Sequence, residues 1–215
     1  MSHQTGNLRA RRTQKLLREA LIALIEERGF DALTVGELTE RAMVSRAAFY
    51  RTYRDKYDLV EQIFEEAMSS LRNAVEVIRT EHPPEVWVTF FEHIGAYDRL
   101  YCALLGRTGS PWFVRKMRES LTELVTTVHA PAPGPQPTAE RPVLTSSDTF
   151  VPGLVSAMLV EAITWWLEQG RPSPPREIAT RCALLTSALF KEVSTWHGPS
   201  GDRSMGKVST QRSSR

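Results

Sequence analysis

The sequence predicts an all-α protein of about nine helices: an N-terminal three-helix bundle, a long connector helix and a C-terminal helical body. Apolar residues recur at the 3.6-residue spacing of amphipathic helices throughout the chain. No period-two apolar run is bounded by turn residues, so strand signals are almost absent. N-cap residues, glycines and prolines divide the apolar patterns into segments of helix length. Helices packed on helices are therefore the expected architecture.

Composition places the chain among ordinary water-soluble proteins. Its 215 residues are 41% hydrophobic and 24% charged, and no run of about 18 apolar residues predicts a membrane-spanning helix. The N-terminus is polar and basic with no apolar stretch behind it, unlike a secretory signal. Cys102 and Cys182 lie inside apolar helical patterns, which predicts neither a disulfide framework nor a zinc site. We therefore expect a cytoplasmic protein with no membrane partner.

The first predicted helix runs from Gln14 to Arg28, with Thr13 as its N-cap. Its apolar residues form one stripe, and Gly29 follows where a left-handed C-terminal cap is wanted. The stripe consists of Leu17, Leu21, Leu24 and Ile25.

Two short helices with a tight connection follow. Thr34 and Glu37, three residues apart, predict a capping box for a helix that ends near Ala42. Ser45 is the next N-cap candidate, and the segment 46–53 has room for barely two helical turns.

Asp55 caps the expected connector helix, which runs from Lys56 to about Thr80 and ends before a Pro-Pro pair. The stretch 130–143, with five prolines and one glycine, is expected to be a surface loop, and 198–215 a disordered tail. Helices of the body are expected over 84–96, 98–105, 110–129, 147–169 and 173–196. The order of elements predicts an N-terminal domain over 1–57, ordered from about residue 10, and a helical body over 58–197.

Charge is distributed unevenly along the chain. Residues 1–57 carry 11 Lys and Arg against 7 Asp and Glu, a net charge of +4. Residues 58–197 have a net charge of −5, and residues 198–215 a net charge of +3. A basic N-terminal segment on an acidic body suggests a polyanion as the partner of the first segment, although four extra charges alone also fit random scatter.

The segment 34–59, TVGELTERAMVSRAAFYRTYRDKYDL, has the layout of a helix-turn-helix. Its first helix would lie across a DNA backbone, with the Thr34 hydroxyl and the positive helix end near a phosphate. Its second helix would enter the major groove, and small or basic side chains at its start suit contact with base edges. The expected base-facing residues are Arg46, Ala47 and Ala48, and the expected phosphate contacts are Thr34, Tyr50, Tyr53 and Lys56. Alternatively, Arg46 is a solvated charge, and Tyr50 and Tyr53 are half-buried core aromatics.

The stretch from about Arg12 to Leu59 resembles the DNA-binding domain of the TetR/AcrR family of bacterial transcriptional regulators. The matching motifs are GFDALTV, ELTERA, VSRAAFYRTY and DKYDL, and the order of the elements also matches. The resemblance implies a homodimer formed by the last two helices, and a ligand pocket in the body whose occupancy sets the affinity for DNA. It also implies backbone contacts by Thr34, Ser45, Tyr50, Tyr53 and Lys56, and base-facing roles for Arg46, Ala47 and Arg51.

Two residues depart from the family's pattern. The family usually has glycine where Met43 stands, between the two short helices, and a left-handed conformation there would cost a non-glycine residue roughly 1 kcal/mol. The family often has threonine, a phosphate ligand, where Ala48 stands. These departures leave a second hypothesis open, in which a protein of this fold acts as a protein-binding co-regulator without direct DNA contact.

The body is rich in aromatic residues, which either fill its core and dimer interface or, in part, line an apolar ligand cavity. The candidate pocket residues are Trp87, Phe90, Phe91, Tyr101, Phe113, Met117 and Trp165. The five histidines are scattered without a nearby cysteine or carboxylate set, so no metal or cofactor is expected. No nucleophile–base pair or phosphate-binding loop predicts an enzyme.

These observations favour a ligand-responsive transcriptional regulator. We expect a repressor that a small, mostly apolar molecule releases from a palindromic operator on double-stranded DNA. Its homodimer would form through 147–169 and 173–196, because these helices carry more apolar residues than one buried face requires.

Overall fold

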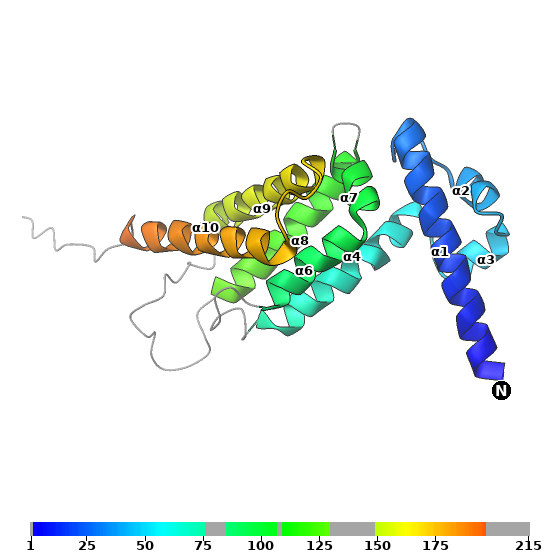
Figure 1. The fold of residues 1–215 in the computed structure, drawn as a ribbon, viewed down its shortest axis with the longest axis horizontal. Helices are drawn as coiled ribbons and strands as arrows, with labels where there is room; N and C mark the ends of the chain where they lie inside the picture. The colour runs from blue at the N-terminus through cyan, green and yellow to red at the C-terminus, as the bar shows by residue number, and fades with distance from the viewer. Residues whose placement is uncertain (1, 76–84, 107–108, 130–148, 197–215) are drawn as a thin grey trace, which may run out of the picture.

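The computed structural model describes residues 2–75, 85–106, 109–129 and 149–196. Over these ranges the chain forms nine α-helices and no strand, which confirms the predicted fold class. The molecule is elongated, with the first three helices at one end and α10 at the other (Figure 1). We call α1–α3 the head and α6–α10 the body; α4 connects the two.

The head consists of α1 (Ser2–Arg28), α2 (Val35–Arg41) and α3 (Arg46–Tyr50). The helix α1 begins twelve residues before the predicted start at Gln14, so the expected N-cap role of Thr13 is wrong. The physical reason is that residues 2–13 contain no proline and a single glycine, so nothing stops the helix before it reaches the chain end.

The core of the head forms where the apolar stripe of α1 meets the two short helices. Leu17, Leu21 and Ile25 are buried against a set contributed by the α1–α2 loop, α2 and α3. The members of that set are Phe30, Leu38 and Phe49. Gly29 closes α1 with a φ of +78°, the left-handed conformation that its position predicts.

The connector α4 (Lys56–Asn73) begins at the predicted residue, and the Asp55 carboxylate accepts a hydrogen bond from the Asp58 N–H at 2.8 Å. Its last helical residue is Asn73 rather than Thr80, and residues 76–84 lie outside the described ranges. The apolar face of α4 packs against α6 and α8, so the connector belongs to the body's core along most of its length.

The body consists of α6 (Glu85–Ala96), α7 (Asp98–Leu105), α8 (Pro111–His129), α9 (Phe150–Glu168) and α10 (Pro175–Trp196). These bounds agree with the predicted segments to within about three residues, as is usual for helix ends. The predicted caps at 147 and 148, the Pro-rich stretch 130–143 and the tail 198–215 lie outside the described residues.

Among the described helices, α9 alone is long and apolar enough to span a membrane by length and composition. Half of that span is buried inside the protein, where α9 packs along α8. The hydroxyls of Thr122 and Ser156 join the two helices through a 2.7 Å hydrogen bond. The core helix of a soluble protein passes the same test of length and composition.

The head rests on the body through an aromatic cluster and an ion pair. Trp112, in the first turn of α8, stacks on Phe30 with ring centroids 5.7 Å apart and meets Tyr57 edge-on at 4.7 Å. Glu26 of α1 pairs with Arg99 of α7 at 2.8 Å. The orientation of the head is therefore set by α7 and α8 as well as by α4.

Candidate nucleic-acid interface

The turn between α2 and α3 holds the two short helices in a helix-turn-helix arrangement. The Val44 N–H donates to the Thr39 carbonyl at 2.9 Å, which folds the chain back on α2. This fold requires a left-handed residue at position 43, and Met43 adopts a φ of +51°. Its side chain is 89% exposed, so no packing compensates the strain. The departure at Met43 thus leaves the turn intact, because methionine accepts the conformation that glycine would adopt freely.

The start of α2 is fixed by the predicted capping box. The Thr34 hydroxyl accepts a hydrogen bond from the Glu37 N–H at 3.2 Å, and the Thr34 N–H donates to the Glu37 carboxylate at 2.9 Å. The Thr34 hydroxyl also donates to the Glu37 carboxylate at 2.9 Å. This bond, the bond from the Thr34 N–H and the neighbouring Arg28 guanidinium at 2.7 Å hold the pKa of Glu37 below its ordinary value. The Thr34 side chain remains at the surface.

The first turn of α3 faces outward. The Ser45 hydroxyl accepts a hydrogen bond from the Ala48 N–H at 3.1 Å and so caps the helix as predicted. Arg46 and Ala47 are exposed, while Ala48 is half-buried. The other side of α3 is anchored by Phe49, which is buried in the head's core. The helix therefore presents small and basic side chains on a rigid support.

Gly36 is a residue that the sequence analysis missed. A Cβ atom at this position would lie 2.6 Å from an Nη atom of Arg46, so the absence of a side chain lets the guanidinium lie against the first turn of α2. A glycine inside a well-capped helix is the signal that could have revealed it, because glycine is unfavourable there unless another group approaches the backbone closely.

The two tyrosines of the segment differ in exposure. Tyr50 is 57% exposed, and Arg51 beside it is also exposed, so both can reach a ligand. Tyr53 is only 5% exposed and packs against Phe49 with ring centroids 5.5 Å apart. Burial raises the pKa of the Tyr53 hydroxyl. The structure therefore favours the core alternative for Tyr53.

The structure corrects the expected role of Lys56. Its side chain is 8% exposed, and its ammonium donates to three carbonyl oxygens of the α1–α2 loop. The acceptors are Phe30 at 2.9 Å, Asp31 at 2.9 Å and Leu33 at 2.8 Å. Because all three N–H groups are used inside the head, the ammonium has no hydrogen left for a phosphate. Burial lowers the pKa of Lys56, and the ammonium also lies 4.8 Å from the centre of the Phe30 ring.

Most of the candidate pocket residues in the body form a packed core. Five of the seven are buried: Phe90, Phe91, Tyr101, Phe113 and Met117. Their rings contact one another or their neighbours, as in the Tyr101–Phe113 pair with centroids 5.9 Å apart and the Phe91–Trp166 pair at 5.6 Å. Trp87 is half-buried, and its ring meets that of Phe90 edge-on at 5.7 Å. The five buried candidates thus fill the interior of the body, as expected if the aromatic residues form a packed core.

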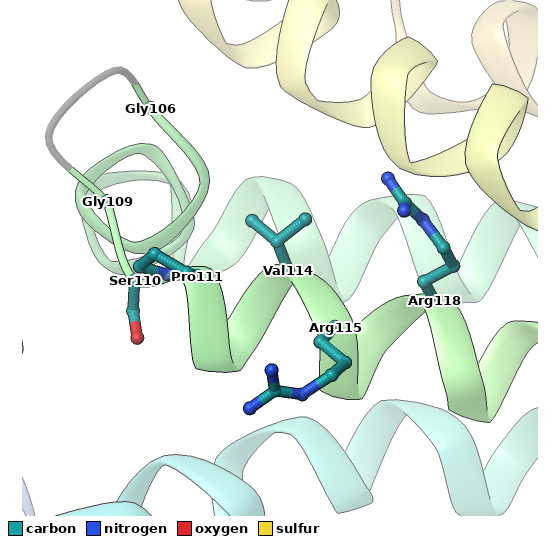
Figure 2. A pocket seen from close by; sticks show the side chains of 7 residues that line it. All are labelled: Gly106, Gly109, Ser110, Pro111, Val114, Arg115 and Arg118. Atoms are coloured by element: carbon teal, nitrogen blue, oxygen red, sulfur yellow. The ribbon is translucent and has the colours of Figure 1, made fainter.

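Two shallow hollows lie at the surface of the described body. One, of about 340 Å³, is lined by the exposed Trp165 and by residues at the α9–α10 turn. The other, of about 380 Å³, lies where the α7–α8 loop meets α8 (Figure 2). Arg115 and Arg118 line it but point in different directions (Figure 2). This second hollow therefore lacks a convergent set of polar groups.

His93 of α6 has a strongly shifted pKa. Burial and the nearby positive charge of Arg18 lower its pKa from 6.5 to about 4, so the ring is neutral near pH 7. Its Nε2 atom is within hydrogen-bond distance of the Tyr101 hydroxyl, at 3.2 Å. No group of three or more His, Cys, Asp or Glu side chains able to hold a metal occurs in the described part of the chain.

Two family models match the chain. Residues 17–63 match the one described as bacterial regulatory proteins, tetR family, and residues 81–187 match the one described as transcriptional regulator C-terminal region. The first match covers α2, α3 and the turn between them, and the second covers most of the body.

Two relatives come from Bacillus subtilis strain 168. The uncharacterised HTH-type transcriptional regulator YxbF is 36% identical over 59 residues, which are 27% of this chain and 16% of YxbF. The uncharacterised HTH-type transcriptional regulator YdeS is 36% identical over 64 residues, which are 30% of this chain and 32% of YdeS. The chain thus matches less than a third of the length of each relative.

Solved structures share the fold over most of the chain. A TetR transcriptional regulator from Streptococcus agalactiae 2603V superposes with a TM-score of 0.53 at 18% identity, covering 85% of this chain and 98% of the other. The dihydroxyacetone kinase operon activator DhaS gives a TM-score of 0.51 at 13% identity, covering 84% and 97%. At these identities the likeness establishes the arrangement of helices.

Proposed function

The chain belongs to the TetR family of bacterial transcriptional regulators, and we propose that it is a ligand-responsive repressor that a small, mostly apolar molecule releases from a palindromic operator. The proposal assigns DNA binding to residues 1–57, and ligand binding and dimerisation to residues 58–197. It places the protein in the cytoplasm, where the operator DNA is.

The exposed first turn of α3 is the observation that carries DNA recognition. Arg46 and Ala47 are exposed at the start of a helix held by the Ser45 cap on one side and by buried Phe49 on the other. A guanidinium at the start of such a helix can donate two hydrogen bonds to a guanine edge in the major groove. Tyr50 and Thr34, at the surface of α3 and α2, suit phosphate contacts that orient the head on DNA.

Exposed apolar residues on α9 and α10 support a homodimer. Leu154 and Trp165 of α9 are 47% and 43% exposed, and Leu184 and Leu185 of α10 are 61% and 57% exposed. Exposed apolar side chains on two contacting helices favour a dimer, because burial against a second copy removes them from water. Two-fold symmetry of the pair would match a palindromic operator.

The side chains of the body support an apolar effector. The ring of Phe91 contacts that of Phe90, and the ring of Tyr101 contacts that of Phe113. Because these side chains are buried, a ligand would bind by moving core side chains apart, and its mostly apolar surface would replace their contacts. A ligand inserted there would reach α4, because Phe113 meets Phe64 of α4 with ring centroids 5.5 Å apart. If the head has two orientations relative to the body, the ligand shifts the equilibrium between them only by as much as its affinity for the two differs.

The co-regulator hypothesis depended on Met43 and Ala48. The left-handed conformation of Met43 keeps the helix-turn-helix in place, so that departure no longer argues against DNA contact. Exposed Arg46, Tyr50 and Arg51 give the head a DNA-binding surface that a protein-binding co-regulator would not need.

A gel shift with the DNA upstream of the protein's own gene, at two salt concentrations, tests the proposal. We expect a protein–DNA complex whose affinity falls as the salt concentration rises. A scrambled duplex of the same composition should not form this complex at equal protein concentration. A screen of small hydrophobic compounds then measures quenching of the body tryptophans and release of the DNA. Compounds that bind but leave DNA affinity unchanged would contradict the ligand response, and equal binding to both duplexes would contradict operator recognition.

A further inference from the structure

The N-terminal half of α1 has a composition that differs from the rest of the helix. The first 18 residues of the chain contain five Lys and Arg and no Asp or Glu, and the first acidic residue is Glu19. Only two of residues 2–13, Leu8 and Ala10, are apolar, whereas the second half of α1 carries the buried stripe of the head. A helix segment without an apolar face has little surface to bury against the rest of its own chain.

This segment extends past the helix-turn-helix. Figure 1 shows the N-terminal turns of α1 running beyond α3, at the end of the molecule away from α10. Residues 2–13 are helical, and at 1.5 Å per residue they span about 18 Å. The DNA major groove is about 12 Å wide, so this segment is longer than the groove is wide.

The basic side chains here have little competing interaction. Arg11 and Arg12 are exposed, and neither forms an ion pair with any of the described residues. Lys15 pairs with Glu19 only at 3.8 Å, with both side chains more than half exposed, so this pair contributes little. Arg11 and Arg12 can therefore bind a polyanion without breaking an ion pair to any of the described residues.

We propose that the N-terminal turns of α1 form a second DNA contact, in which Arg11 and Arg12 neutralise backbone phosphates beside the groove that α3 enters. The inference rests on the proposed DNA binding and extends it beyond the helix-turn-helix. Its partner follows from charge complementarity and from the position of this segment, which runs beyond α3 (Figure 1). Phosphate contacts carry no base information, so the segment adds affinity for every sequence while α3 supplies the discrimination.

The test compares charge variants of the full chain on two duplexes, the DNA upstream of its own gene and a scrambled duplex. In the double variant Arg11→Gln/Arg12→Gln, the slope of log affinity against log salt should become less negative by about 2 for each protomer, since each lost phosphate contact removes about 0.9. Both duplexes should lose affinity by the same factor. The variant Arg11→Lys/Arg12→Lys should keep the wild-type slope, and Arg115→Gln, which removes one charge from the body, should leave it unchanged.

The outcomes separate this inference from the proposed function. If the wild type binds DNA and the glutamine variant has the same slope, the second contact does not exist and the helix-turn-helix alone binds. A loss confined to the upstream DNA would mean base contact and overturn the phosphate role. If the wild type binds neither duplex, the proposed function fails and the inference fails with it. Thermal unfolding of the variants, expected at the wild-type temperature because both arginines are exposed, verifies that the head remains folded.

Discussion

At the scale of single residues, Lys56 shows why a cation in a DNA-binding segment need not contact DNA. Its position at the start of α4 suggests a phosphate contact, yet its ammonium closes the α1–α2 loop by hydrogen bonds to three carbonyls. The sequence could not predict this because the acceptors lie 23 to 26 residues earlier in the chain. The sequence position of Lys56 places its backbone at the start of α4, but the contacts of its ammonium depend on how the α1–α2 loop packs.

The variant Lys56→Met therefore tests a structural role. It should lower the free energy of unfolding by about 3 kcal/mol, because two buried carbonyls and one partly buried carbonyl lose their donor. The slope of DNA affinity against salt should stay at the wild-type value. Lys116→Met is the matched control: it removes a lysine whose pair with Glu61 is partly exposed, so it should cost less than about 1 kcal/mol. Urea unfolding measures both variants, and equal costs for the two would contradict the assignment.

Met43 makes a second prediction at this scale. Met43→Gly should raise the stability of the protein by roughly 1 kcal/mol, because glycine adopts a positive φ without strain and the exposed side chain contributes no packing. Met43→Ala keeps the strain, so thermal unfolding should show little change from the wild type. A stabilisation by alanine as large as that by glycine would mean that the gain does not come from the backbone conformation.

At the scale of elements, the accuracy of the prediction depends on whether the signal is local. Thr34, Ser45 and Asp55 each cap a helix where predicted, because a cap depends on one side chain and the next three residues. The start of α1 is predicted at Gln14 but lies at Ser2. Thr13 is a competent cap, yet a cap residue does not end a helix when the residues before it are themselves helix-compatible.

The lowered pKa of His93, which lies in α6 and contacts Tyr101 of α7, predicts how the stability of the protein depends on pH. Its pKa is about 4 in the folded protein and 6.5 as the ordinary value, so between these two pH values the unfolded chain takes up a proton that the folded chain does not. Stability is therefore constant above pH 6.5 with respect to this group, falls as the pH drops from 6.5 to 4, and stops changing below 4. His93→Gln, which cannot titrate, should flatten that part of the profile.

The measurement is urea unfolding of the wild type and of His93→Gln across this pH range. The variant can still donate to the Tyr101 hydroxyl, so its stability near pH 7 should remain close to the wild-type value. Identical pH profiles for the two proteins would show that the acid sensitivity comes from other groups.

At the scale of the whole molecule, α7 and α8 join the head to the helices that carry the exposed apolar surface. Trp112 of α8 contacts the head through Phe30 and Tyr57, while Asp98 of α7 pairs with Arg171 at the α9–α10 turn at 3.0 Å. The sequence predicts the components of this arrangement but not these contacts, because they join residues far apart in the chain. The aromatic residues of the body illustrate the same limit: composition alone could not separate a packed core from a cavity.

Substitution of the exposed leucines of α10 tests the proposed dimer interface. Leu185→Glu, and more strongly Leu184→Glu/Leu185→Glu, should convert the proposed dimer into a monomer, since charged carboxylates would be buried without partners. Sedimentation at micromolar concentration measures the mass. Arg115→Glu, on the exposed side of α8, should keep the wild-type mass. A wild type that already sediments as a monomer would contradict the interface.

Selection of DNA from a pool of random duplexes tests the central claim most directly, because the operator sequence does not have to be chosen in advance. The full chain is incubated with the pool, and the retained duplexes are sequenced. We predict a two-fold symmetric motif whose half-site centres lie about 34 Å apart, one helical turn, or a multiple of it. With Arg46→Ala, the preference at one base position of each half-site should relax, at a cost of about 1–3 kcal/mol. A retained pool without any enriched motif, or a motif that Arg46→Ala leaves unchanged, would contradict recognition by α3.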